Sequence, residues 1–393
     1  KWVFNRQMVT WAALHGGEGM IGSFAMRCMV DWHRADGAKE LQVPRIQLES
    51  IVIFGYVGVS PEAMNLCVDN GISLVFLTPT GRFKARVTGE VSGNIHLRRT
   101  QYRWCDREEQ SLLLAKRFVY SKLVNARVSV KRTLRDYAER IQAEQCQSVV
   151  TWLDRQMREV VKAKSLDELR GIEGLAARHY FSVLPEQILA NKEDFAFRGR
   201  VKRPPRDRVN ALLSFLYTLL ANDVTHALET VGLDPQAGYL HRDRPGRNGL
   251  ALDLMEEFRV YMADRTALTL INRKQVTKDD FVEKESGAFI LNDEARKLVL
   301  TEWQQRKRDE IYHPFFEEKI AVGLLPYAQA MLLARYMRGD LDDYPPFFGS
   351  RVMWDDGVDY LRCKYNLCRR AKTVEAGCQN MRKLRPASAE FGV

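Results

Sequence analysis

His241, Asp253 and Glu256 are residues of the types that bind divalent cations, and they lie close together in the chain. The segment 242–248 contains a Pro-Gly pair and predicts a turn, whereas residues 249–259 have the pattern of a helix. Residues three apart share a helix face, so Asp253 and Glu256 are expected to project together beside His241. One imidazole and two carboxylates suit Mg²⁺ or Mn²⁺. The plainer alternative is a solvated helix face, but the apolar neighbours of Asp253 favour a buried acid that needs a partner or a metal.

A further acid, Glu173, lies upstream between Gly171 and Gly174, at the start of a helical pattern. An acid in the first turn of a helix interacts favourably with the helix dipole, and this is one interpretation of Glu173. The order of the sequence blocks around it gives a second.

Four ordered blocks resemble the CRISPR-associated spacer-acquisition integrase, the metal-dependent DNA integrase and endonuclease of prokaryotic adaptive immunity. The blocks are 173–181 (Glu-Gly-x-x-Ala-Arg-x-Tyr-Phe), 203–217 (Arg-Pro-Pro-Arg-Asp-x-Val-Asn-Ala-Leu-Leu-Ser-Phe-x-Tyr), 238–241 (Gly-Tyr-Leu-His) and 252–259 (Leu-Asp-Leu-x-Glu-x-Phe-Arg). The resemblance runs from about residue 37 to residue 348, and it is strongest to the branch that accompanies type I systems of the I-C kind.

The resemblance implies a ligand set and an active centre. Glu173, His241 and Glu256 would be the catalytic ligands of Mg²⁺ or Mn²⁺, with Asp253 as a neighbouring acid that assists or binds a second ion. Some relatives carry Asp where this chain has Glu256. Tyr217 would face the active centre; without the resemblance it is a core tyrosine.

The resemblance also implies a reaction and a set of partners. A 3′ hydroxyl of a short DNA fragment would attack a phosphodiester at the edge of a CRISPR repeat, and water as the nucleophile would give endonuclease activity. The expected partners are double-stranded DNA (prespacer and repeat), a second copy of the chain in a homodimer, and a small ferredoxin-like companion subunit. A nuclease that trims the prespacer is a further expected partner.

Two alternatives come from other classes of protein. A DNA-binding scaffold without turnover explains the basic surface but makes Glu173, His241 and Glu256 dispensable. A metal-dependent nuclease unrelated to CRISPR would cut DNA without joining it.

Composition favours a folded protein with a polyanionic partner. The 393 residues carry 60 Lys and Arg against 50 Asp and Glu, a net charge of +10, and 46% are hydrophobic. Seven cysteines without paired spacing argue against a disulfide scaffold and favour the cytoplasm. No apolar run is long enough for a membrane span, so no membrane partner is expected.

The fold class expected is α+β, with a small N-terminal β domain followed by a larger all-helical catalytic domain. Residues 37–92 form the β domain, which makes dimer contacts in the resembled family, because short β-rich runs alternate there with turn signals. Helical spacing begins near residue 102, and the catalytic domain covers 93–348. Residues 1–36 are an unassigned extension, and residues 349–393 are an unassigned basic tail.

The most basic stretch lies between residues 191 and 208 and predicts a DNA-contact loop, since two prolines forbid a continuous helix. Phe195 and Phe197 are placed where a base or sugar could stack on them. A plain linker is the alternative. The expected DNA-binding residues are Arg198, Arg200, Lys202, Arg203, Arg206 and Arg208.

Overall fold

The computed structural model describes residues 9–12, 19–24, 29–34, 39–44, 48–54, 58–78, 83–87, 89, 95–201 and 204–349. Lys202 and Arg203 of the predicted DNA-contact loop lie outside the described residues, as does the tail from residue 350. Strands dominate the described residues up to 89, and helices dominate from 95 onward, which confirms the α+β class. The domain boundaries at 36, 92 and 348 remain predictions.

The N-terminal region contains two four-stranded sheets and one helix. The first sheet has the order β1-β5-β7-β8, with parallel pairing from β1 to β7 and antiparallel pairing of β7 with β8. The second has the order β4-β3-β2-β6. The elements are β1 (Val9–Ala12), β2 (Gly19–Phe24), β3 (Met29–Arg34), β4 (Lys39–Pro44), β5 (Leu48–Phe54), β6 (Gly58–Val59), α1 (Pro61–Asp69), β7 (Ser73–Leu77) and β8 (Phe83–Val87).

Local sequence explains the α1–β7 unit of this region. The Ser60 hydroxyl accepts a hydrogen bond from the Ala63 N–H at 3.2 Å and caps α1, and Pro61 occupies the first turn, where its missing N–H costs nothing. Ile53 of β5, Leu66 of α1 and Leu74 of β7 are among the buried side chains of the core. β1, β2 and β3 fall within the extension that the sequence left unassigned.

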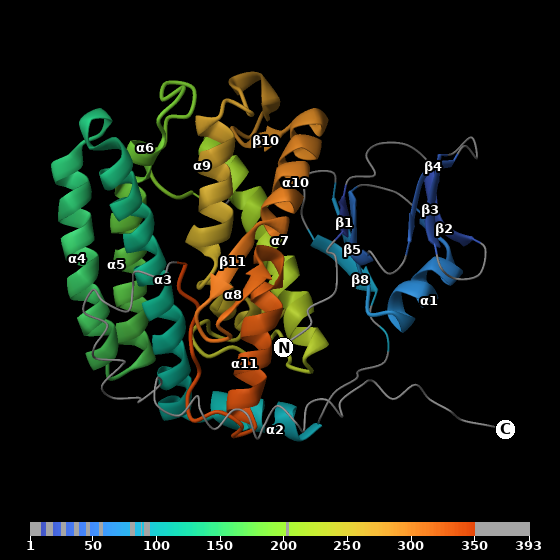
Figure 1. Ribbon diagram of the computed structural model, residues 1–393, viewed down its shortest axis with the longest axis horizontal. Coiled ribbons are helices and arrows are strands. Elements are labelled where there is room, and N and C mark those ends of the chain that lie inside the picture. Colours follow the sequence, from blue (N-terminus) through green and yellow to red (C-terminus); the bar gives the residue numbers. More distant parts are fainter. Residues whose placement is uncertain are drawn as a thin grey trace. The chain divides into compact units, whose positions relative to one another are not determined.

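The helical region is assembled around α3 and α7. Figure 1 shows α3, α4 and α5 side by side, and α7 next to α11. The helices are α2 (Ile95–Cys105), α3 (Glu108–Tyr137), α4 (Ala143–Lys162), α5 (Leu166–Ser182), α6 (Leu184–Gln187), α7 (Arg208–Thr230), α8 (Gly249–Met255), α9 (Arg265–Asn272), α10 (Asp293–Arg308) and α11 (Leu325–Met337). A π-helical turn, η3 (Arg259–Asp264), follows α8, and short 3₁₀ turns occupy η2 (Ala138–Arg140), η4 (Lys278–Asp280) and η5 (Val322–Leu324).

The region from residue 95 onward is not purely helical, because two short antiparallel ribbons interrupt its described residues. The ribbons are formed by β9 (Phe281–Glu283) with β10 (Phe289–Leu291), and by β11 (Glu310–His313) with β12 (Glu318–Ala321). In the described part of the chain, no helix is both long and apolar enough to cross a bilayer.

Candidate active site

A cleft of about 670 Å³ lies between α3, α5, α7 and the turn that follows α8. Its lining combines three acid or imidazole groups with several cations. The charged and imidazole residues on its wall are Lys122, Glu173, Arg178, Arg198, Arg200, His241, Glu256 and Arg259. The structure therefore brings the predicted ligands Glu173, His241 and Glu256 to one cleft, although they are separated by as many as 83 positions in the sequence.

Lys122 of α3 joins two of the predicted ligands. Its ammonium contacts a carboxylate oxygen of Glu173 and lies 2.8 Å from Oε2 of Glu256. Glu173 lies in the middle of α5, so it does not serve as the acid in the first turn that interacts with the helix dipole. The two carboxylates converge on one positive charge, which is the electrostatic arrangement that a bound cation requires.

Glu256 is a fully charged, deeply buried acid. Burial alone would raise its pKa, but the charges of Arg259, Lys122 and His241 outweigh burial and lower the pKa to about 2. The Arg259 guanidinium lies 3.0 Å from Oε1 of Glu256. Oε2 is buried, and its charge is compensated by the Lys122 ammonium 2.8 Å away. Among the described residues, no other group donates a hydrogen bond to this oxygen.

Asp253 holds His241 in place, and both of its carboxylate oxygens are engaged by the loop that carries this histidine. One carboxylate oxygen lies 2.5 Å from Nδ1 of His241 and also accepts the His241 N–H at 3.0 Å. The other accepts the N–H groups of Tyr239 at 2.5 Å and Leu240 at 2.9 Å. Asp253 is completely buried and does not line the cleft. The expectation that Asp253 and Glu256 project together beside His241 is wrong. The Asp253 carboxylate binds the N–H groups of residues 239–241, whereas the Glu256 carboxylate lies against Lys122 and Arg259.

Two glycines allow the His241 loop to press against α8. A Cβ on Gly238 would lie 2.6 Å from the carbonyl carbon of Gly249, and a Cβ on Gly249 would lie 2.7 Å from the Gln236 oxygen. The backbones cross too closely for any other residue. This crossing places the Tyr239–His241 N–H groups around the Asp253 carboxylate.

The donor set fits a hard divalent cation, although its members are not drawn together around one point. Across the described ranges, no three His, Cys, Asp or Glu side chains are grouped tightly enough to hold an ion. The fit rests instead on chemistry. Glu173 and Glu256 both contact the Lys122 ammonium, and Oε2 of Glu256 is buried. His241 has the carboxylate support that is typical of metal-bound imidazoles.

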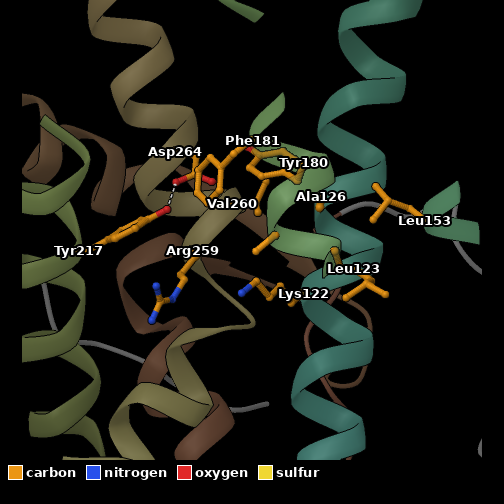
Figure 2. A pocket seen from close by; sticks show the side chains of 12 residues that line it. Lys122, Leu123, Ala126, Leu153, Tyr180, Phe181, Tyr217, Arg259, Val260 and Asp264 are labelled. Atoms are coloured by element: carbon orange, nitrogen blue, oxygen red, sulfur yellow. Dashed lines mark hydrogen bonds between the residues drawn. The ribbon is translucent and has the colours of Figure 1, made fainter. Parts of the chain in front are cut away.

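Tyr217 belongs to the cleft wall, but its hydroxyl is turned away from the ligands. It donates a hydrogen bond of 2.7 Å to Asp264, and Figure 2 shows this pair beside the cationic ends of Arg259 and Lys122. The Tyr217 ring lies between the guanidinium carbons of Arg200, 5.2 Å away, and Arg259, 5.0 Å away. Burial raises the pKa of Asp264 to about 6, against the bonds from the tyrosines and the nearby arginines. Tyr217 thus positions Arg259 and is a poor proton donor or acceptor for substrate.

The described arginines of the basic stretch differ in exposure and in the partners that they contact. Arg198 is exposed on the cleft wall, and Arg206 is exposed. Arg200 bonds Asn210 at 2.7 Å and Ser214 at 3.0 Å, and Arg208 bonds the Asp194 carbonyl at 2.9 Å. The last two arginines are therefore partly committed to holding the loop against α7.

The two phenylalanines of this stretch are both largely buried. Phe195 is 1% exposed and Phe197 is 7% exposed. Phe195 packs edge-on against Phe281, and Phe197 packs against Phe181. The expectation that a base stacks on Phe195 is wrong, because its ring is buried in the core. Phe197 is largely buried but lines the cleft, so stacking on it stays a prediction.

Sequence reasoning missed Lys122 and Arg259 as parts of the site. Lys122 is one of many cations on α3, and nothing in its local pattern marks it. Arg259 closes the fourth sequence block and stands three residues after Glu256, so an i, i+3 ion pair was the signal available.

An α+β fold with a carboxylate–imidazole centre at the base of an arginine-lined cleft defines a class of enzyme that acts on phosphodiesters. Within that class, the family described as CRISPR associated protein Cas1 matches residues 29–305. The chain belongs to this family, and the prediction of an enzyme of the endonuclease kind is confirmed.

Close relatives support the assignment along most of the chain. CRISPR-associated endonuclease Cas1 1 of Chlorobaculum tepidum is 50% identical over 312 residues, which cover 79% of this chain and 91% of that relative. CRISPR-associated endonuclease Cas1 2 of Rhodospirillum rubrum is also 50% identical, over 80% of this chain and 91% of the relative. A Cas4/Cas1 fusion of Geobacter sulfurreducens is 35% identical over 77% of this chain and 54% of the fusion.

Solved structures share the fold at lower identity. A Cas1 protein from Thermotoga maritima has a TM-score of 0.71 and 23% identity, covering 86% of this chain and 99% of that protein. A casposase bound to an integration product has a TM-score of 0.74 and 20% identity, over 91% of this chain and 99% of the casposase. A Cas6-RT-Cas1–Cas2 complex gives a TM-score of 0.72 at 24% identity, over 89% of this chain and 37% of the complex's chain.

Proposed function

We propose that this chain inserts short DNA fragments into a CRISPR array. A 3′ hydroxyl of the fragment attacks a phosphodiester at the repeat edge; a new P–O bond forms as the bond to the repeat's own 3′ oxygen breaks. The observation that carries the proposal is that Glu173 and Glu256 both contact the Lys122 ammonium, in the same cleft as His241, which Asp253 holds in place.

Glu173, His241 and Glu256 are the residues that would hold Mg²⁺ or Mn²⁺. Such an ion, when bound, neutralises charge on the phosphate and stabilises the attacking and leaving oxygens. The protein's own residues do the rest. Asp253 keeps the His241 ring in one orientation, and the exposed Arg198 attracts the DNA backbone to the cleft.

We propose the companion subunit and the trimming nuclease from the names of similar proteins, and the DNA substrate and the homodimer from the family resemblance. One similar structure is a Cas6-RT-Cas1–Cas2 complex, and one relative is a fusion of Cas4 exonuclease with Cas1 endonuclease. We infer that this chain acts on double-stranded DNA as a homodimer with a small ferredoxin-like companion subunit, and with a nuclease that trims the prespacer. A cytoplasmic location belongs to the same proposal, because the array is genomic DNA.

The test is a strand-transfer reaction with a labelled short duplex, a supercoiled plasmid that carries the repeat, the companion subunit and Mn²⁺. His241→Ala is expected to lower the yield of joined product by more than about 100-fold, because loss of even the group that supports a metal-bound histidine costs 10–100-fold. His179→Ala is the matched control, since His179 stacks on Trp152 and does not line the cleft.

Each of the other outcomes would favour a different activity or contradict the proposed site. Unchanged joining by His241→Ala would contradict the site. Cutting without joining by the wild type would favour a plain nuclease, and DNA binding without product from either protein would favour a scaffold.

A further inference from the structure

A cluster of arginines surrounds Tyr261 among residues that do not line the active-site cleft. The guanidinium carbon of Arg306 lies 4.8 Å from the centre of the Tyr261 ring, and that of Arg265 lies 5.8 Å from it. Arg132 is close enough to act electrostatically on Arg265. Three separate helices, α3, α9 and α10, supply these cations, so the cluster is not the solvated face of one helix. We call these four residues the Tyr261 cluster.

The acidic partners of the Tyr261 cluster are too few and are already engaged. Asp309 lies 2.8 Å from Arg306, and Asp136 lies 3.6 Å from Arg132 and 2.7 Å from its neighbour Arg135. The Arg265 guanidinium makes no ion pair or hydrogen bond with any residue that the structure describes, and its contact is with the Tyr261 ring.

The excess of positive charge in the cluster disfavours the charged form of Arg265. Burial and the charges of Arg306 and Arg132 together lower the pKa of Arg265 to about 10, because they outweigh the opposing effects of Tyr261 and Asp309. A half-buried guanidinium held next to two like charges is a costly arrangement unless an anion completes it. Arginine's planar fork matches the oxygens of a phosphate.

We propose that the Tyr261 cluster binds a backbone phosphate of DNA, as a second contact outside the cleft. The inference rests on the proposed function, because DNA is the polyanion on which this family's chemistry would act. Arg265 is the central donor, Arg306 is held in place by Asp309, and the more exposed Arg132 completes the site from α3.

The experiment measures binding of the full-length protein to a fluorescein-labelled duplex by anisotropy at a series of NaCl concentrations. Arg265→Gln is expected to weaken binding by about eightfold near 0.1 M salt and to reduce the slope of log K against log salt by about one, the effect of one lost phosphate contact. Arg132→Gln, at an exposed position, should act in the same direction and serves if Arg265→Gln fails to fold. Arg135→Gln is the matched control, because Arg135 already has Asp136 as its partner.

The joining rate at saturating DNA should stay unchanged in Arg265→Gln. An equal loss of affinity in Arg265→Gln and Arg135→Gln would overturn the site in favour of general surface charge. So would an unchanged salt slope, or a fall in the saturated joining rate, which would mean that Arg265 acts through the active site. If wild type neither binds nor joins DNA, the proposed function itself fails. If wild type binds and joins while neither Arg265→Gln nor Arg132→Gln differs from it, only this inference fails.

Discussion

At the scale of single residues, Lys122 is the least expected member of the site. The ammonium is buried, and although burial opposes its charge, Glu256 and Glu173 raise its pKa above the usual range. It therefore stays charged at neutral pH and compensates two carboxylates that would otherwise repel one another. A divalent cation bound by the same two carboxylates would supply the same compensation.

Replacing Lys122 by Met should destabilise the protein mainly when metal is absent. Breaking a buried ion pair by removing one partner costs about 3–5 kcal/mol, because it leaves a buried charge without compensation. A bound divalent ion would compensate the same carboxylates. We expect Lys122→Met to lower the melting temperature in EDTA, and Mn²⁺ to restore most of the loss, as measured by thermal unfolding across a Mn²⁺ titration.

The control for this prediction is Lys162→Met, which removes an exposed lysine paired with Glu159 at 3.0 Å. Exposed pairs contribute roughly 0–1 kcal/mol, so little change is expected with or without metal. An equal loss for Lys122→Met in EDTA and in Mn²⁺ would show that its role is packing and not compensation of the ligands.

The residue scale also shows what sequence could supply. The proposed ligands His241, Glu173 and Glu256 were singled out because each belongs to a short block of characteristic residues. The role of Asp253 was not, because it depends on a loop folding back so that three successive N–H groups meet one carboxylate. A linear pattern of acids and a histidine does not distinguish a ligand from the group that orients it.

At the scale of elements, the segment 343–349 fastens the site to the core. Glu257, the neighbour of Glu256, accepts hydrogen bonds from the Tyr344 hydroxyl at 2.8 Å and from the Phe347 N–H at 2.7 Å. Gln329 of α11 donates to Glu257 at 3.0 Å. The Glu257 carbonyl accepts from Asn125 of α3 at 2.8 Å. The turn that carries Glu256 is thereby held between α3, α11 and this segment.

His313 extends the same network and makes its stability depend on pH. The side chain is 1% exposed, its Nε2 lies 3.2 Å from the Gln329 oxygen, and burial lowers its pKa to about 4 despite that bond. The unfolded chain binds the proton near pH 6.5, whereas the folded chain resists it down to about pH 4. Stability is therefore fully present above pH 6.5 and is lost as pH falls toward 4, by about 3 kcal/mol in all.

The difference between wild type and His313→Gln in urea unfolding, followed from pH 7 to pH 4, checks this prediction. The free energy of unfolding should fall more steeply in the wild type, by up to about 3 kcal/mol at pH 4. Taking the difference matters, because Glu257 acts in the opposite sense. Burial raises its pKa to about 8, so it costs stability as pH rises from 4.5 to 8. His96→Gln on α2 is the control, and parallel curves for wild type and His313→Gln would contradict the assignment.

Element boundaries were predictable where local signals are strong. The change from strands to helices was expected, because short β-rich runs with turn signals give way to helical spacing near residue 102. The break at Met255 was not expected, since residues 249–259 keep helical spacing while the structure ends α8 early and continues in a π-helical turn. Tertiary hydrogen bonds to Glu257 and ion pairs to Glu256 determine that break.

At the scale of the whole molecule, the excess of positive charge is distributed to at least two places within the described residues. The cleft collects Arg178, Arg198 and Arg259, and the Tyr261 cluster collects three more arginines. A net charge of +10 predicted a polyanionic partner but not this division. Composition cannot reveal this division of charge, because the Tyr261 cluster is assembled from positions between 132 and 306 that share no motif.

If one DNA duplex spans both surfaces, their losses should add. Arg198→Gln removes an exposed cleft cation and Arg265→Gln removes the central donor of the Tyr261 cluster. The two side chains share no partner, so their free energies of binding should be independent. Each loss is expected to be about eightfold near 0.1 M salt, and the double variant should bind about 60-fold more weakly, with a salt slope reduced by about two. Titration of a long and a short duplex against all four proteins measures this. With a duplex too short to reach beyond the cleft, the Arg265→Gln loss should disappear while the Arg198→Gln loss persists; an Arg265→Gln loss that is the same for both lengths would mean that the two surfaces do not bind one continuous duplex.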